Sequence, residues 1–293
     1  MSTASRASRL EDLIARDVGR GIGPLAQAAA GGLGRAAAAL ADARAVSILT
    51  GFYIPGANPP AAETDGPIGT AFLAAALVGH GVPVRVVTDQ PCAPVVAAAI
   101  AAAGLERTVS LDVVALERFA GGEPLEVVLQ RHFAAPPSHV VAIERCGPGL
   151  GDVPRNARGE DIGAHTAPLE RFFTPPAYRI AIGDGGNELG MGALPLDLVA
   201  AHVANGETVA CRVPADALIV AGVSNWGAAA LALLLGGPGA DHVDGATHDR
   251  LLAAIVRAGA VDGITRTATA TVDGIAALEH RAVIDALAAE ARA

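Results

Sequence analysis

The sequence contains no lysine, so all 21 basic residues among its 293 residues are arginine. This absence excludes a Schiff-base lysine, a lysine general base and the lysine of a phosphate-binding P-loop. Recognition of an anionic ligand by a basic side chain must therefore rely on arginine, whose planar guanidinium matches carboxylates and phosphates.

Cysteine is also scarce. Cys92, Cys146 and Cys211 lie far apart and form no CxxC pair, which argues against a zinc site and a disulfide scaffold. A reducing, cytoplasmic setting is the simplest expectation. The first 16 residues include Glu11 and Asp12 and have no apolar stretch, so we expect no secretory signal, while a transit peptide stays open.

Positive charge is in deficit, with a net charge of -9, and we expect no nucleic-acid partner because such proteins present a basic face. Apolar residues make up 52% of the chain, which excludes wholesale disorder. Residues 217–240 carry no charge, but they include Ser224, Asn225 and Pro238. A strand, turn and helix fit this composition better than a membrane-spanning helix, so we expect no membrane partner.

Short apolar segments alternate with helix-like segments along the chain. This pattern predicts a three-layer α/β/α sandwich with a mostly parallel, doubly wound sheet, formed by residues 1–293 as one domain. The predicted strands are Val46–Thr50, Val82–Thr88, Thr108–Val114, His139–Ile143, Arg179–Ile182 and Ala217–Ala221. The predicted helices between them are Ile68–His80, Pro94–Ala103, Pro124–Phe133, Leu196–Ala204 and Trp226–Leu235. We further expect one or two helices within Leu10–Leu40, and two helices around a loop at Asp262–Gly274.

Ligands of such sheets bind beyond the carboxyl ends of the strands, and the loop Gly183–Gly192 lies at such an end. Its glycines allow close approach to a ligand, and Asp184 and Glu188 offer the hard oxygen donors that Mg²⁺ or Mn²⁺ prefers. The alternative is a flexible turn with solvated acids. A dinucleotide-binding GxGxxG would require glycine where Glu188 stands.

Two further loops carry acids. Glu63 and Asp65 precede a predicted helix, where they would bind a metal or an anion or, in the case of Asp65, cap the helix. Glu144 and Arg145 end an apolar strand, either as site residues or as a solvated tip. Cys146 follows them and is interpreted as a small residue rather than a nucleophile.

Candidate ligand-binding residues lie in two more segments. Arg158 belongs to the long irregular stretch Arg145–Thr174, where it would clamp a carboxylate or form a surface salt bridge. Ser224 and Asn225 open a predicted helix, as its cap or as ligand contacts.

Together these motifs resemble the D-glutamate cyclase C-terminal domain family, from about Leu10 to about Leu278. Gly183–Gly192 and Glu63–Pro67 are the most specific parts of the resemblance. The full set of matching motifs is Thr50–Phe52, Glu63–Pro67, Glu144–Arg145, Arg158–Gly159, Asp161–Ile162, Thr166–Leu169, Gly183–Glu188, Gly190–Gly192 and Ser224–Gly227.

The resemblance implies an enzyme, a lyase that converts D-glutamate to 5-oxo-D-proline and water. A divalent ion would polarise the γ-carboxyl group, and a carboxylate would accept the ammonium proton. We expect Mg²⁺ or Mn²⁺ as cofactor and no nucleotide. The expected metal ligands are Asp65, Asp184 and Glu63; the expected catalytic residues are Asp184, Glu188 and Glu144; the expected substrate-binding residues are Arg145, Arg158, Asn187, Ser224 and Asn225.

Two other functions are compatible with the residues. One is a metal-dependent enzyme that acts on a phosphorylated or nucleotide ligand held by the glycine-rich loops. The other is a small-ligand-binding module without catalysis. In each case the expected partner is a small molecule, an amino acid for the cyclase, and assembly into a homo-oligomer is left open.

Overall fold

The computed structural model describes residues 3–293. Its centre is a six-stranded sheet that is parallel throughout, with the strand order β5-β4-β1-β6-β7-β8. The strands are β1 (Val46–Thr50), β4 (Val84–Asp89), β5 (Val109–Val114), β6 (His139–Ile143), β7 (Tyr178–Gly183) and β8 (Ala217–Val220). Each of the six predicted strands is confirmed to within two residues.

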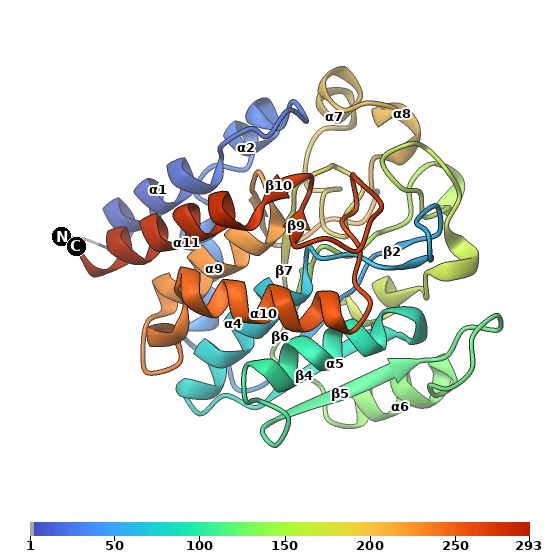
Figure 1. Cartoon of the computed structure of the whole chain (residues 1–293), viewed down its shortest axis with the longest axis horizontal. Helices are drawn as coiled ribbons and strands as arrows, with labels where there is room; N and C mark the ends of the chain where they lie inside the picture. Colours follow the sequence, from blue (N-terminus) through green and yellow to red (C-terminus); the bar gives the residue numbers. More distant parts are fainter. Residues whose placement is uncertain (1–2) are drawn as a thin grey trace.

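Helices cover both faces of the sheet, which confirms the α/β fold (Figure 1). One face packs against α1 (Thr3–Ile14), α3 (Gly32–Leu40), α4 (Pro67–Gly79), α5 (Ala93–Ala102), α9 (Ser224–Leu235), α10 (Gly245–Arg257) and α11 (Ala277–Arg292). The other face packs against α2 (Gly23–Ala28), α6 (Leu125–Ala134) and α7 (Leu196–His202). Successive strand residues alternate between these two cores, because neighbouring side chains of a strand point to opposite faces. Ile48, for example, lies in the first core and Leu49 in the second.

The helices α4 and α9 are buried along most of their length. A helix that is apolar on every side is stable only in such an interior. This explains the uncharged residues 217–240, which form β8, a turn and α9 as expected. Among the described residues, no helix is long and apolar enough to cross a membrane.

The chain reverses its direction of progress through the sheet between β1 and β6, which are adjacent. At such a switch point the loops that follow the two strands leave in opposite directions and open a crevice. The loop after β1 and the residues after β6 therefore meet at one place on the carboxyl edge.

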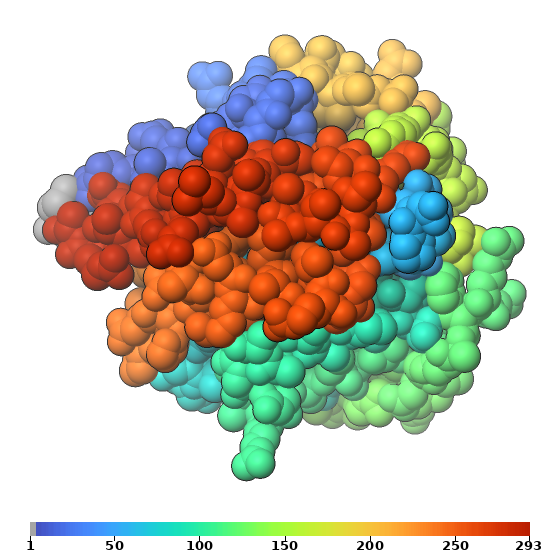
Figure 2. All heavy atoms as spheres, viewed as in Figure 1, coloured from blue at the N-terminus to red at the C-terminus, as the bar shows by residue number. Residues whose placement is uncertain are grey.

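Several elements differ from the sequence expectation. The N-terminal region forms three helices, and α10 begins at Gly245. Two short antiparallel hairpins, β2 (Tyr53–Ile54) with β3 (Ala61–Ala62) and β9 (Thr271–Val272) with β10 (Ile275–Ala276), were not predicted as strands. The remaining elements are α8 (Gly206–Val209) and the 3-10 helices η1 (Gln90–Cys92), η2 (Leu150–Asp152), η3 (Gly163–His165), η4 (Leu169–Phe172) and η5 (Ala240–His242). In Figure 2 the C-terminal segments, in orange and red, cover much of the visible face beside the β2–β3 hairpin in light blue.

Candidate active site

A cavity of about 340 Å³ opens at the carboxyl edge of the sheet. Its size is at the lower end of the range of small-ligand pockets, roughly 300–1,000 Å³. Phe52 and Ile54 give it an apolar wall, and the loops after β6 and β7, the Asn156–Arg158 segment and the turn between β9 and β10 supply polar groups. The lining residues are Gly19, Arg20, Phe52, Ile54, Glu63, Glu144, Asn156, Ala157, Arg158, Asp184, Gly185, Asn187, Glu188, Val203, Ala204, Gly263, Ile264 and Asp273.

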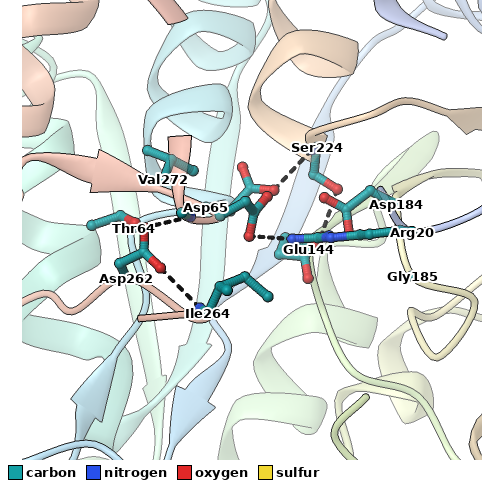
Figure 3. Close-up of polar contacts among 12 residues, drawn as sticks. Arg20, Thr64, Asp65, Glu144, Asp184, Gly185, Ser224, Asp262, Ile264 and Val272 are labelled. Atoms are coloured by element: carbon teal, nitrogen blue, oxygen red, sulfur yellow. Dashed lines mark hydrogen bonds and ion pairs between the residues drawn. The ribbon is translucent and has the colours of Figure 1, made fainter. Parts of the chain in front are cut away.

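Acidic side chains dominate the floor of this cavity. Five carboxylates line it, and Asp65 lies directly behind, within 4.8 Å of its acidic neighbours measured between carboxylate oxygens. The side chains of all six are buried, and they come from four separate segments of the chain; Asp65, Glu144 and Asp184 are labelled in Figure 3. The acidic cluster, as we call this set, comprises Glu63, Asp65, Glu144, Asp184, Glu188 and Asp273.

One basic side chain enters the acidic cluster. Arg20 lies in the loop between α1 and α2, and its guanidinium contacts Asp184 through one nitrogen and Asp273 through the other. Among residues 3–293, no other arginine forms an ion pair with the acidic cluster. One positive charge cannot balance six buried carboxylates, so the cluster requires protons or another cation.

Burial therefore raises the pKa of several of these carboxyl groups. It raises the pKa of Asp184 to about 6 and that of Asp273 to about 7, although Arg20 lowers both. Burial, together with the charges of neighbouring carboxylates, also holds the pKa values of Glu63, Asp65 and Glu144 well above their ordinary range. Groups with perturbed pKa values in a cavity are typical of functional sites.

The acidic cluster has the chemistry of a site for a hard divalent cation. Oxygens of Asp65, Asp184 and Asp273 lie within 4.8 Å of one another, close enough to share one ion. The Oδ2 atoms of Asp184 and Asp273 and Oε1 of Glu63 are buried and have no hydrogen-bond partner. Buried polar atoms are rarely left unpaired, so a bound cation or proton accounts for these three. The residues present thus fit Mg²⁺ or Mn²⁺.

Glu188 faces the cavity but is engaged by its own loop. Its two carboxylate oxygens accept hydrogen bonds from the N–H groups of Gly185 and Gly186, each at 2.7 Å. A weaker hydrogen bond at 3.3 Å comes from the N–H of Asp184. The glycine-rich turn that could have cradled an external anion is therefore filled by an internal one.

Glu144 directly follows β6 and turns into the cavity with a positive φ of 43°. Non-glycine residues adopt this conformation rarely and at an energetic cost. The Oγ–H of Ser224 donates a 2.6 Å hydrogen bond to Oε2 of Glu144. Ser224 thus lies behind the cavity and orients a residue of the cavity wall.

Asp65 and Asn225 lie below the cavity floor. The Asp65 carboxylate accepts hydrogen bonds from the N–H groups of Ser224 and Asn225, and the Asn225 side chain accepts from those of Gly66 and Gly69. Asn225 is fully buried, and its amide nitrogen donates to the carbonyl of Thr64. Both residues therefore serve as helix caps here.

Arg145 points away from the cavity. It is 1% exposed and forms a 2.6 Å ion pair with Asp89. It also donates to the carbonyl groups of Gly51 and Ala167. The sequence places it beside Glu144, and neighbouring side chains at a strand end project to opposite sides. Its guanidinium is therefore used inside the fold rather than in the cavity.

Arg158 and Asn187 do reach the cavity wall. Arg158 is exposed, and its backbone N–H is held by the side chain of Asn156. Asn187 donates from its amide nitrogen to the carbonyl of Arg155. Arg158 is thus the sequence-predicted arginine that is placed to meet an anionic ligand.

Sequence reasoning did not find Arg20 and Asp273, because neither follows a strand of the large sheet. One signal was available for Asp273, which forms the hairpin turn between β9 and β10 together with Gly274. Both residues have positive φ, at 56° and 76°, and an Asp-Gly pair is a strong hairpin signal. No comparable signal marks Arg20, which reaches the cavity through packing of the N-terminal segment.

Two comparisons with known proteins identify the family of this chain. The family model of the D-glutamate cyclase-like C-terminal domain matches residues 10–288. The chain is 35% identical over 247 residues to the human protein "D-glutamate cyclase, mitochondrial", a match that covers 80% of this chain and 39% of the human protein. The chain thus spans well under half the length of that relative. It belongs to the D-glutamate cyclase-like family, in its C-terminal domain.

Proposed function

We propose that the protein cyclises D-glutamate to 5-oxo-D-proline and water with the help of Mg²⁺ or Mn²⁺. The observation that carries the proposal is the buried acidic cluster with three unpartnered oxygens, in a cavity of amino-acid size, in a member of this family. An excess of carboxylates suits a metal and the ammonium group of an amino acid.

The reaction joins the substrate's α-nitrogen to its γ-carbon. The ammonium group first loses a proton, the free amine attacks the γ-carboxyl carbon, and one γ-oxygen leaves as water with the two protons lost by nitrogen. The amine and the γ-carboxyl group belong to one molecule and are held in contact. The reaction therefore avoids much of the entropic cost of bringing them together, and no activating nucleotide is required.

Glu144 is the proposed proton carrier. It faces the cavity, its elevated pKa makes it a stronger base than an ordinary carboxylate, and Ser224 fixes its orientation. It accepts the ammonium proton and returns it to the departing oxygen. Arg158 binds a substrate carboxylate from the exposed side of the cavity.

Asp184 and Asp273, with Asp65 behind them, are the residues that would hold the metal. When bound, the ion would neutralise the γ-carboxylate and stabilise the negative charge that develops on its oxygen. Glu63 lies beside this group with an unpartnered oxygen and can donate a hydrogen bond from its protonated form.

A phosphorylated or nucleotide substrate is opposed by two observations. The carboxylates of the cavity repel phosphate, and the N–H groups of the glycine turn already donate to Glu188.

The cyclase proposal is tested by incubating purified, Mn²⁺-loaded protein with D-glutamate, L-glutamate and 5-oxo-D-proline separately, followed by chiral chromatography. We expect interconversion of D-glutamate and its lactam, with slower turnover of L-glutamate. No change in either D-compound would contradict the proposal.

A further inference from the structure

We infer that Arg20 is an exchangeable counterion: it neutralises Asp184 and Asp273 until a divalent cation binds there, and it then turns to bind the anionic group of the ligand. The second half of this inference rests on the proposed function, whereas the first half does not.

Arg20 and a divalent cation would compete for one pair of carboxylates. The two terminal nitrogens of Arg20 contact Oδ1 of Asp184 and Oδ1 of Asp273, and the Oδ2 atoms of both residues stay unpartnered. A cation that uses those free oxygens would lie next to the guanidinium. Repulsion between the two positive charges, in a site with little water, then favours departure of Arg20.

Charge balance favours the same exchange. The six carboxyl groups of the acidic cluster outnumber the single positive charge of Arg20. A divalent ion neutralises two carboxylates, whereas an arginine neutralises one. An inorganic cation also loses no side-chain freedom when it binds, whereas an arginine held in one rotamer does. A divalent ion at sufficient concentration should therefore displace the guanidinium of Arg20 from Asp184 and Asp273.

The position of Arg20 permits it to leave. Its side chain is 22% exposed, whereas those of Asp184 and Asp273 are 2% and 4% exposed. Gly19 and Gly21 flank it with φ values of 94° and 74°, and apart from its two chain neighbours no residue has an atom within 4 Å of the place where a Cβ of Gly19 would stand. The backbone turn itself is fixed by Asp17, whose carboxylate accepts the N–H groups of residues 19–21. The side chain can thus swing along the cavity wall while its anchor stays in place.

Once released, the guanidinium of Arg20 can bind a carboxylate of the ligand in the same cavity. A dicarboxylic amino acid brings two negative groups into a site lined with acids, and a metal can neutralise one of them. Arg20 lines the same cavity and supplies the planar donor pair that a carboxylate prefers. Exchange would therefore couple metal binding to carboxylate binding, because the cation frees a second arginine, in addition to Arg158, to bind the substrate.

The test measures Mn²⁺ binding without substrate, by electron paramagnetic resonance, for the wild type, Arg20→Met and Arg16→Met. Arg16 is the matched control, since it belongs to the same segment and pairs with exposed Glu279 at 3.5 Å. We expect Arg20→Met to bind Mn²⁺ at least tenfold more tightly than the other two proteins. Equal or weaker binding by Arg20→Met would overturn the inference.

Arg20→Gln guards against loss of folding, because glutamine keeps a donor for Asp184 and removes only the charge; the same tightening is expected. A second measurement repeats the Mn²⁺ titration with D-glutamate present. We expect D-glutamate to tighten Mn²⁺ binding in the wild type and not in Arg20→Met, and an equal effect in both would refute the anion-binding role. If the wild type leaves D-glutamate unchanged but Arg20→Met still binds Mn²⁺ more tightly, the cyclase proposal fails and the counterion role stands.

Discussion

Asp65 and Asn225 cap each other's helices. The Asp65 carboxylate, just before α4, accepts the first N–H groups of α9, and the Asn225 side chain, in α9, accepts N–H groups at the start of α4. The distances lie between 2.7 and 3.0 Å. This exchange joins two buried helices below the acidic cluster and fixes where Asp65 stands.

Asn225→Ala should therefore reduce stability more than ligand affinity. It leaves the N–H group of Gly69 buried without an acceptor, at about 1–3 kcal/mol, whereas the N–H of Gly66 keeps Oδ1 of Asp65 as its acceptor. Urea unfolding measures the loss, and the KM for D-glutamate in the surviving protein should stay within about threefold of the wild type, a factor worth under ~1 kcal/mol. A raised KM with unchanged stability would instead make Asn225 a ligand contact.

Arg145 and Arg158 should respond oppositely to the same substitution. Arg145→Met breaks a buried ion pair and leaves Asp89 unpaired, which typically costs about 3–5 kcal/mol. Arg158→Met removes an exposed side chain of the cavity wall, so it should raise KM at little cost in stability. Thermal unfolding and steady-state kinetics on both variants separate the two roles, and the reverse assignment would count against the described geometry.

Stability should depend on pH through the acidic cluster. Because the pKa values of Asp184 and Asp273 are raised to about 6 and about 7, the folded chain holds more protons than the unfolded chain up to about pH 7. Stability should therefore fall as pH rises through these values. Burial lowers the pKa of His132 and of His280 to about 4, which acts in the opposite sense below pH 6.5. The interval from about pH 6.5 to 8 isolates the carboxyl groups.

The measurement is the melting temperature of cation-free protein across that interval, with and without Mn²⁺. We expect the melting temperature to fall toward pH 8 and Mn²⁺ to raise it more at pH 8 than at pH 6.5. In Asp273→Asn the slope should be shallower. A melting temperature that rises with pH, or a Mn²⁺ effect independent of pH, would contradict the account of the acidic cluster.

The sequence predicted the sheet well because its strands are short, apolar and buried, as in β6, where all five residues are buried. It also located the strand-end acids, since the carboxyl ends of parallel strands meet at one edge. It did not distinguish which side of the strand end each side chain occupies, and so Arg145 was expected in the cavity beside Glu144. Arg20 and Asp273 reach the cavity through tertiary packing of the two chain-terminal regions; the Asp273–Gly274 pair indicates a turn, but no local pattern indicates that this turn lies at the cavity.

The central claim is tested most directly by D-glutamate labelled with ¹⁸O on both γ-oxygens, incubated with Mn²⁺-loaded wild type, Asp184→Asn and Asp216→Asn. Asp216 is a control outside the cavity, where it pairs with Arg179. For the wild type and Asp216→Asn we predict 5-oxo-D-proline that carries one ¹⁸O, with the other in water. Asp184→Asn should be slower by roughly a hundredfold or more, the range of a lost catalytic group. No lactam from the wild type, or a rate for Asp184→Asn within about twofold of it, far less than the tenfold that ~1.4 kcal/mol represents, would contradict the account.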